Sequence, residues 1–314
     1  MKNHLPKLVV ILGPTASGKT DLAISLARKF NGEIISADSR QIFKKMDIGT
    51  AKPAGEWQTV GGRAIYVVEG IPHYGMDMVD PGYEMSVAEF KALACAAIQD
   101  ITARGKIPFL VGGTGLYIWA VVDNLDMPKI APNKKLRRSL EEKPLSDLRA
   151  LLTSLDPEAA KFVDMNNPRR VTRALEVNIL SGESFVHQRR MAAPLVNTLQ
   201  IGLAWEKNEL IARLEGRVDE QIRRGLVRET EILMKQCYDW NLPSMSSIGY
   251  KQIGSYWRGE CTLEDAIVII KTETRRYAKR QLTWFKRDQR INWITDEFVT
   301  AAEKLVKNFL VSRE

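Results

Sequence analysis

The sequence predicts an α/β protein: a P-loop parallel sheet flanked by helices, with a mainly helical insertion domain and a helical C-terminal region. Three observations lead to this fold class. An apolar strand runs directly into GPTASGKT, strands and helical patterns alternate up to about residue 120, and one further strand follows a long helical stretch. We therefore assign 1–122 and 197–314 to the P-loop core with its C-terminal helices, and 123–196 to a helical insertion domain.

The first element is the apolar strand Leu8–Leu12, which the motif GPTASGKT follows directly. This is the P-loop pattern, shared by ATP-binding proteins, between a buried strand and a helix that we expect over about Lys19–Phe30. Its glycines let backbone N–H groups converge on an anion, Lys19 adds a cation, and the Thr20 hydroxyl can hold Mg²⁺. The motif therefore predicts a site for a di- or triphosphate. It comprises Gly13, Pro14, Thr15, Ala16, Ser17, Gly18, Lys19 and Thr20.

The next elements follow from hydrophobic periodicity. Further strands are expected at 33–37, 65–68, 107–111 and 199–205. Apolar residues recur at helical spacing over 86–103, and the alternation of strands and helices predicts a parallel sheet with helices on both faces. From about Asp123 a Lys- and Arg-rich stretch leads into helical patterns, with N-caps expected at Ser146, Asp156 and Asn167.

Composition bounds the class of protein. The 314 residues are 45% hydrophobic and include 46 basic against 38 acidic side chains, so the net charge of +8 favours a polyanionic partner. The three cysteines form no CxxC pair and the three histidines have no ligand spacing, so we expect neither a disulfide framework nor a zinc site. The N-terminal apolar run is too short for a signal peptide and we find no membrane span, which predicts a cytoplasmic protein.

Two loops beside the P-loop carry candidate functional residues. Asp38 follows the second strand, where the carboxyl ends of parallel strands form a crevice, so it is a candidate general base or magnesium ligand. The alternative is an N-cap for the next segment. Gly112-Gly113-Thr114-Gly115 follows another strand and predicts either a phosphate or substrate contact or a plain tight turn. The lack of an Asp at this strand end argues against ATP hydrolysis.

A basic segment lies at 271–290, where eight Lys and Arg residues face two acidic ones and give a net charge of +6. Helical spacing places Arg276, Lys279, Thr283, Arg287 and Arg290 on one face, and aromatic residues are interleaved with the charges. This pattern predicts phosphate contacts and stacking on a nucleic acid, whereas a solvated helix face is the alternative. The cluster at 167–173 indicates the same, although Arg173 and Glu176 could instead pair along a helix.

Together these segments resemble the bacterial tRNA dimethylallyltransferases, also called tRNA isopentenyltransferases. The matching strings are GPTASGKT at 13–20, ADSRQIF at 37–43, DIGTAKP at 47–53, LVGGTGLY at 110–117, NPRRVTRALEV at 167–177, SSIGYKQ at 246–252 and TRRYAKRQLTWFKRD at 274–288. They occur in the family's order and span nearly the whole chain.

The resemblance implies transfer of a dimethylallyl group from dimethylallyl diphosphate to the exocyclic amine of the adenosine 3′ of the tRNA anticodon. It implies that Gly13–Thr20 bind the donor diphosphate with Mg²⁺ on Thr20, that Asp38 is the general base, and that Lys19 and Thr20 assist catalysis. The segments around the target nucleotide and the anticodon stem-loop would bind tRNA. They are Asp38, Ser39, Arg40, Gln41, Thr114, Arg169, Arg170, Val171, Thr172, Arg173, Ser246, Ser247, Ile248, Gly249, Tyr250, Lys251, Lys279, Arg280, Gln281, Leu282, Thr283, Trp284, Phe285 and Lys286.

Two rival enzymes share part of this pattern. An adenylate isopentenyltransferase acting on free AMP, ADP or ATP shares the P-loop and the general base but needs no +6 helix. A small-molecule P-loop kinase would leave the basic helix and the insertion without a role. Nothing in the sequence requires a partner subunit, so we expect a monomer.

Overall fold

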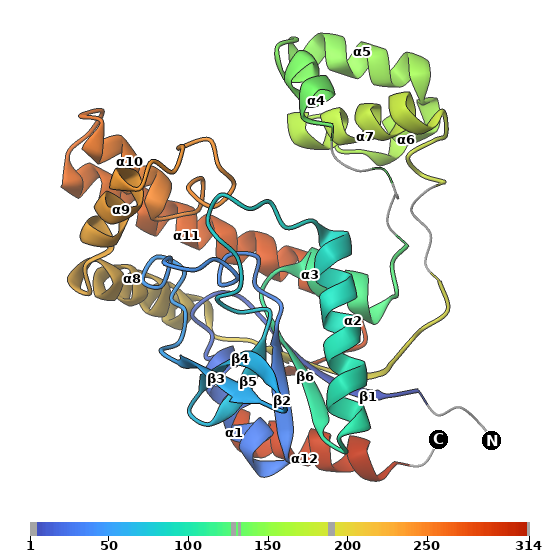
Figure 1. Cartoon of the computed structure of the whole chain (residues 1–314), viewed down its shortest axis with the longest axis vertical. Helices are drawn as coiled ribbons and strands as arrows, with labels where there is room; N and C mark the ends of the chain where they lie inside the picture. Colours follow the sequence, from blue (N-terminus) through green and yellow to red (C-terminus); the bar gives the residue numbers. More distant parts are fainter. Residues whose placement is uncertain (1–4, 127–129, 131–132, 188–191, 313–314) are drawn as a thin grey trace. The chain divides into compact units, whose positions relative to one another are not determined.

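The computed structural model describes residues 5–126, 130, 133–187 and 192–312. The chain forms two compact units, one made of Met1–Val122 with Leu195–Glu314 and the other of Asp123–Pro194 (Figure 1). The first unit contains the sheet and the C-terminal helices. The second contains helices alone among its described residues.

The sheet of the first unit has eight strands in the order β3-β4-β5-β2-β6-β1-β7-β8. The strands are β1 (Lys7–Leu12), β2 (Gly32–Ser36), β3 (Glu56–Val60), β4 (Arg63–Val68), β5 (Ile71–Tyr74), β6 (Ile107–Gly112), β7 (Asn197–Leu203) and β8 (Ile291–Ile294). From β5 to β8 every neighbouring pair is parallel. The predicted α/β class is therefore confirmed, and β1 lies at the centre of the parallel part, directly before the P-loop.

One edge of the sheet differs from the prediction. The strand expected at 65–68 belongs to β4, which pairs antiparallel with both β3 and β5, so a wholly parallel sheet is wrong. The reason lies in two-residue turns, Gly61-Gly62 and Glu69-Gly70, whose φ angles are all positive. Such turns match the twist of a hairpin and reverse the chain at once, which leaves no room for a crossover helix.

Helices cover both faces of the sheet. On one face α1 (Lys19–Lys29) and α12 (Phe298–Val311) share an apolar layer with the strands. On the other face α2 (Val87–Ala103) and α3 (Gly115–Val122) form the second layer. The predicted helices at 19–30 and 86–103 are thus α1 and α2, and Ser86 begins α2 with a capping box to Glu89.

The C-terminal region adds four helices beside the sheet: α8 (Lys207–Arg223), α9 (Leu226–Lys235), α10 (Tyr250–Trp257) and α11 (Leu263–Phe285). Their apolar faces pack around Ile42, Phe43 and Met46, which follow Asp38 in the chain. Because α11 ends at Phe285, Arg287 and Arg290 do not continue its basic face as expected. Arg290 instead donates to Asp288 in the turn after the helix.

A buried ion cluster lies near the amino end of β2. The Glu33 carboxylate, whose side chain is fully buried, accepts hydrogen bonds from both Nη atoms of Arg104 at 2.6 Å, from Lys106 at 2.8 Å and from Tyr74 at 2.9 Å. Burial alone would raise the pKa of Glu33, but these donors lower it to about 2. The cluster fastens α2 to the sheet at the end opposite the P-loop.

The second unit contains α4 (Lys134–Glu141), α5 (Leu145–Leu155), α6 (Pro157–Phe162) and α7 (Pro168–Ser181) around its own apolar core. Asp156 and Asn167 cap α6 and α7 as predicted. The predicted cap at Ser146 is wrong, because α5 begins directly after Pro144 and Ser146 lies in its first turn. In the part of the chain that the structure describes, none of the helices is both long and apolar enough to cross a membrane.

Candidate active site

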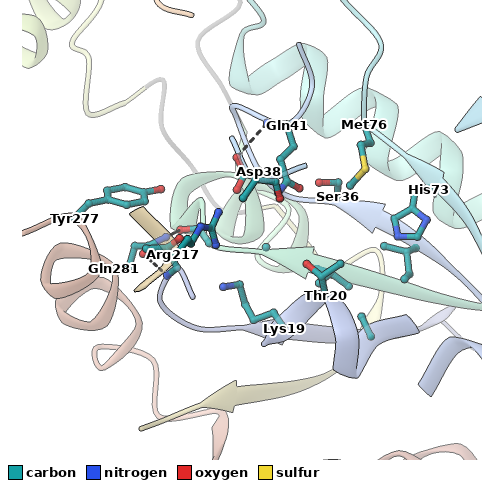
Figure 2. Close-up of a pocket in the computed structure, with 17 residues that line it drawn as sticks. Lys19, Thr20, Ser36, Asp38, Gln41, His73, Met76, Arg217, Tyr277 and Gln281 are labelled. Carbon is teal, nitrogen blue, oxygen red and sulfur yellow. Dashed lines mark hydrogen bonds between the residues drawn. The ribbon is translucent and has the colours of Figure 1, made fainter. Parts of the chain in front are cut away.

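A pocket of about 80 Å³ opens where β1, β2 and β6 end (Figure 2). Side chains from the P-loop, the Asp38 turn, α8 and α11 converge on it. Its polar lining includes Thr15, Lys19, Thr20, Ser36, Asp38, Gln41, His73, Arg217, Tyr277 and Gln281. The predicted phosphate loop and the predicted general base therefore line one pocket, although Thr20 and Asp38 are 18 positions apart in the chain.

The P-loop has the backbone shape that its motif predicts. Gly18 precedes α1 in the left-handed region at φ 85°, and Ala16 also has a positive φ of 61°. The loop carbonyls are fixed from outside, because Arg213 donates to the Ala16 oxygen at 2.9 Å and the Trp205 indole donates to the Ser17 oxygen at 3.0 Å. The Arg213 guanidinium also stacks on Trp205 at 4.0 Å. The loop is thus held in shape by the segment that follows β7.

Lys19 extends along the loop into the pocket. Its Nζ donates to the Pro14 carbonyl at 2.6 Å and to Ser17 Oγ at 3.4 Å. Burial, and then the neighbouring Arg217 guanidinium, lower the pKa of Lys19 to about 7, although the Asp38 carboxylate acts in the opposite direction. An ammonium group that is partly removed from water in this way is stabilised in its charged form when an anion binds beside it.

Arg217 is a charged residue of the pocket that the sequence did not predict. It comes from α8, lines the pocket and donates from Nη2 to the Thr50 carbonyl at 3.3 Å. Burial lowers the pKa of this guanidinium, and Asp38 opposes that effect. Two partly buried cations, Lys19 and Arg217, thus line the pocket with one carboxylate, Asp38. This excess of positive charge in a desolvated pocket is suited to a polyanionic group.

Asp38 lies two residues beyond the end of β2, in the turn that leads away from the sheet. Its Oδ1 accepts hydrogen bonds from the backbone N–H of Arg40 at 2.8 Å and of Gln41 at 3.3 Å. The capping role that sequence analysis left open therefore belongs to Oδ1. None of the described residues donates a hydrogen bond to Oδ2, so the second oxygen is available for a proton or a cation.

The segment after Asp38 is clamped by the C-terminal helices. Glu229 of α9 accepts from the backbone N–H groups of Asp47, Ile48 and Gly49 at 2.9, 2.8 and 3.0 Å. Gln41 donates back to the carbonyls of Thr50 and Ala51 at 3.3 and 3.2 Å. The DIGTAKP segment thus connects α9 to the pocket wall, a role that its sequence does not reveal.

The second glycine cluster is a close-packed turn. A Cβ on Gly112 would lie 2.1 Å from the backbone oxygen of Ala37, so only glycine fits beside the residue that precedes Asp38. Thr114 fixes the same turn, because its Oγ1 accepts from the Ser39 N–H at 3.1 Å. The tight-turn interpretation therefore accounts for Gly112, and Thr114 positions the turn that carries Asp38.

The residues predicted to bind tRNA divide by burial. Several side chains are exposed, and these are Arg169, Arg170, Lys251, Lys279, Arg280, Thr283 and Lys286. Others are partly buried, namely Ser39, Arg40, Thr114, Arg173, Ser246, Ile248, Leu282 and Trp284. A third group is buried and is not presented at the surface: Gln41, Val171, Thr172, Ser247, Gly249, Tyr250, Gln281 and Phe285. The predicted segments are thus surface features only in part.

Arg173 has a structural partner within the second unit. Its guanidinium donates to the buried carboxylate of Glu176, which also accepts from Arg137 at 2.9 Å, and to the Ile130 carbonyl at 3.0 Å. The intrahelical pair considered from the sequence is therefore confirmed. Arg173 stabilises the core of its own unit, whereas Arg169 and Arg170 remain exposed.

His73 forms part of the pocket wall without a metal-binding arrangement. Its Nδ1 lies 2.8 Å from the Ile71 carbonyl, its Nε2 has no hydrogen-bond partner, and burial lowers its pKa. Among the described residues, no group of three or more His, Cys, Asp or Glu side chains could hold a metal ion.

The comparison with known proteins decides the family. A family model described as IPP transferase matches residues 41–288, which is more than half of the chain. The chain belongs to the IPP transferase family. Among curated relatives, the tRNA dimethylallyltransferase of Acetivibrio thermocellus is 44% identical over 311 residues, covering 97% of this chain and 96% of the relative. The tRNA dimethylallyltransferase 2 of Geotalea uraniireducens is 43% identical, covering 96% and 97%.

Solved structures of the family share the whole fold. The tRNA isopentenylpyrophosphate transferase of Bacillus halodurans superposes with a TM-score of 0.71 at 37% identity, covering 97% of each chain. A eukaryotic dimethylallyltransferase acting on tRNA superposes with a TM-score of 0.79 at 31% identity, covering 98% of this chain and 80% of that one. The resemblance drawn from the sequence motifs is therefore confirmed.

Proposed function

We propose that this IPP transferase moves a dimethylallyl group from dimethylallyl diphosphate to N6 of the adenosine 3′ of the anticodon in tRNA, and releases diphosphate. The observation that carries the proposal is the pairing, in one pocket, of two partly buried cations, Lys19 and Arg217, with the Asp38 carboxylate. The cations suit the diphosphate and the carboxylate suits the acceptor amine. The curated relatives are named tRNA dimethylallyltransferases.

The acceptor needs help because the lone pair of an adenine amine is delocalised into its ring. As the new N–C bond forms, the amine must lose a proton. We assign that proton to Oδ2 of Asp38, since Oδ1 is engaged by backbone N–H groups of the turn. General-base help of this kind contributes roughly 10²–10⁴-fold to a rate.

The donor needs a stabilised leaving group. The C–O bond to diphosphate breaks as the N–C bond forms, and negative charge grows on the departing oxygen. The P-loop N–H groups, Lys19 and Arg217 are arranged to stabilise that charge in a desolvated pocket. Exclusion of water also protects the reactive allyl carbon from hydrolysis.

The residues present fit a magnesium ion. Thr20 lines the pocket and offers its hydroxyl oxygen. Mg²⁺ is commonly held by one or two protein oxygens together with substrate phosphates and waters, so this sparse donor set is appropriate. Thr20 would hold the ion, which would neutralise charge on the diphosphate when bound.

The tRNA would be held by exposed basic side chains on α11 and by the pair Arg169 and Arg170, since phosphate contacts dominate nucleic-acid affinity. The target base is stacked in the anticodon loop and must be extruded to reach Asp38. We further propose that the enzyme acts as a monomer in the cytoplasm, where its tRNA substrate is found.

The test compares tRNA with free nucleotides as acceptors of the allyl group. The purified chain is incubated with Mg²⁺ and labelled dimethylallyl diphosphate, either with an unmodified tRNA whose anticodon loop carries a run of adenines or with AMP and ATP. We expect label in the tRNA alone. Label in the free nucleotides would favour an adenylate isopentenyltransferase, and label in neither would return the small-molecule kinase to consideration.

A further inference from the structure

Gln281 of α11 bridges the two loops that form the floor of the pocket. Its Oε1 accepts the backbone N–H of Thr15 in the P-loop at 2.9 Å, and its Nε2 donates to the Gly113 carbonyl at 2.9 Å. The side chain is only 6% exposed and lines the pocket. Both ends of one amide are thus committed to backbone groups that lie 98 residues apart in the chain.

The Gly-Gly-Thr-Gly turn is shaped to admit this bridge. A Cβ on Gly113 would lie 2.3 Å from Gln281 Nε2, and a Cβ on Gly115 would lie 2.3 Å from the Trp284 ring. A larger residue at Gly113 would therefore displace the Gln281 amide, and one at Gly115 would displace the Trp284 ring. The same turn thus provides the space in which α11 docks against the P-loop.

The opposite side of α11 presents the exposed basic residues. Lys279, Arg280 and Thr283 lie within two positions of Gln281 and are exposed to solvent, whereas Tyr277, one turn earlier, lines the pocket. One continuous 23-residue helix therefore carries a basic outer face and an inner face that touches the P-loop. The helix α11 thus connects the exposed basic residues to the P-loop within a single element.

We propose that Gln281 is a positioning residue that couples tRNA binding on α11 to the diphosphate-binding shape of the P-loop. It does so by fixing the Thr15 N–H through its Oε1 while Gly113 anchors its other end. This assignment replaces the direct tRNA contact that sequence motifs implied for Gln281. It rests on the proposed function, since it concerns the sites for the two substrates of that reaction.

The experiment measures binding of inorganic pyrophosphate with Mg²⁺ by calorimetry, with and without saturating tRNA. The variants are Gln281→Met, which keeps the side-chain length without either hydrogen bond, and Gln281→Glu, which retains an acceptor but cannot donate to Gly113. The matched control is Gln200→Met, because Gln200 is also buried and donates to Asp288 through its own amide on β7. Thermal unfolding of each protein verifies that it is folded.

In the unaltered chain we expect tRNA to tighten pyrophosphate binding about five-fold or more, within the usual range of coupling between sites. Gln281→Met should remove this effect and raise the KM for the donor, while its affinity for tRNA stays within two-fold. Gln281→Glu should lose the effect as well, and Gln200→Met should keep it.

Three results would overturn the inference. If Gln281→Met weakens tRNA binding and leaves pyrophosphate binding unchanged, the residue is a nucleic-acid contact. If both Gln281 variants retain the tRNA effect, or if Gln200→Met loses it equally, Gln281 has no special coupling role. Failure of the unaltered chain to bind either ligand would instead count against the proposed function, which separates the two cases.

Discussion

Replacing Gly112 by alanine tests how closely the Asp38 turn is packed against β6. The added Cβ would lie 2.1 Å from the Ala37 oxygen and 2.4 Å from the Ala37 carbonyl carbon. Carbon atoms in contact prefer about 3.5–4.0 Å, so the two backbone segments must separate by about 1 Å or more. Both obstacles are backbone atoms, and no side-chain rotation can relieve the overlap.

The cost of Gly112→Ala can be worked from the bonds at this point. The Ala37 N–H donates to the Val111 carbonyl at 2.7 Å, and the Thr114 N–H donates to the Ala37 carbonyl at 3.1 Å. Overpacking costs about 1–3 kcal/mol and each of the two lost hydrogen bonds about 1 kcal/mol, so we expect the free energy of unfolding to fall by roughly 3–5 kcal/mol. A displacement of about 1 Å at Asp38 should lower the rate of transfer about 100-fold.

The assays are urea denaturation and single-turnover transfer of the labelled allyl group to tRNA. The matched control is Gly216→Ala in the middle of α8, where an added Cβ meets nothing within 4 Å. That variant should gain up to about 1 kcal/mol of stability and keep the normal rate. If Gly112→Ala behaves like Gly216→Ala, the close approach of these two loops does not position Asp38.

Three further predictions follow from other regions. The double variant Lys279→Ala, Arg280→Ala should bind tRNA more weakly, and the slope of log affinity against log salt concentration should become smaller by about 1.5. Lys304→Ala on α12 should change neither quantity. An unchanged slope in the double variant would contradict phosphate contact. Because the folded-state pKa of Glu33 lies at about 2, below its ordinary 4.5, its stabilisation is complete above pH 4.5 and is lost as pH falls toward 2. In urea titrations, the free energy of unfolding of the unaltered chain should therefore fall by roughly 3 kcal/mol over that pH interval relative to that of the Glu33→Gln variant. A difference in free energy between the two proteins that does not change with pH would refute the role of the ion cluster. Glu229→Gln removes the charged acceptor of three loop N–H groups, so it should lower the free energy of unfolding by about 2–3 kcal/mol and raise the KM for the donor. A normal KM would argue against a role of Glu229 in holding this loop.

Sequence reasoning located the parts of the site that depend on local patterns. The P-loop combines a strand, glycines and a helix within 20 residues, and each of these has its own signal. Asp38 was found because the carboxyl ends of parallel strands share one edge of the sheet. Both inferences need only short stretches of chain and the general geometry of parallel sheets.

Other parts depend on contacts between distant segments. Arg217 lies in an ordinary amphipathic helix among other charged residues, so nothing local marks it as the one that enters the pocket. The hydrogen bonds of Gln281 could not be seen before α11 was placed beside the P-loop. The hairpin at 56–74 could have been found, because Gly61-Gly62 is a hairpin turn signal between two strand patterns.

The measurement that tests the central claim most directly is transfer by the Asp38→Ala variant, with tRNA and pyrophosphate binding followed in parallel. We expect transfer to fall at least 100-fold while both ligands bind within about three-fold of normal, because Asp38 acts on the proton of the acceptor amine. Loss of tRNA binding together with transfer would instead make Asp38 a structural residue of its turn. Normal transfer would contradict the proposed role of this carboxylate altogether.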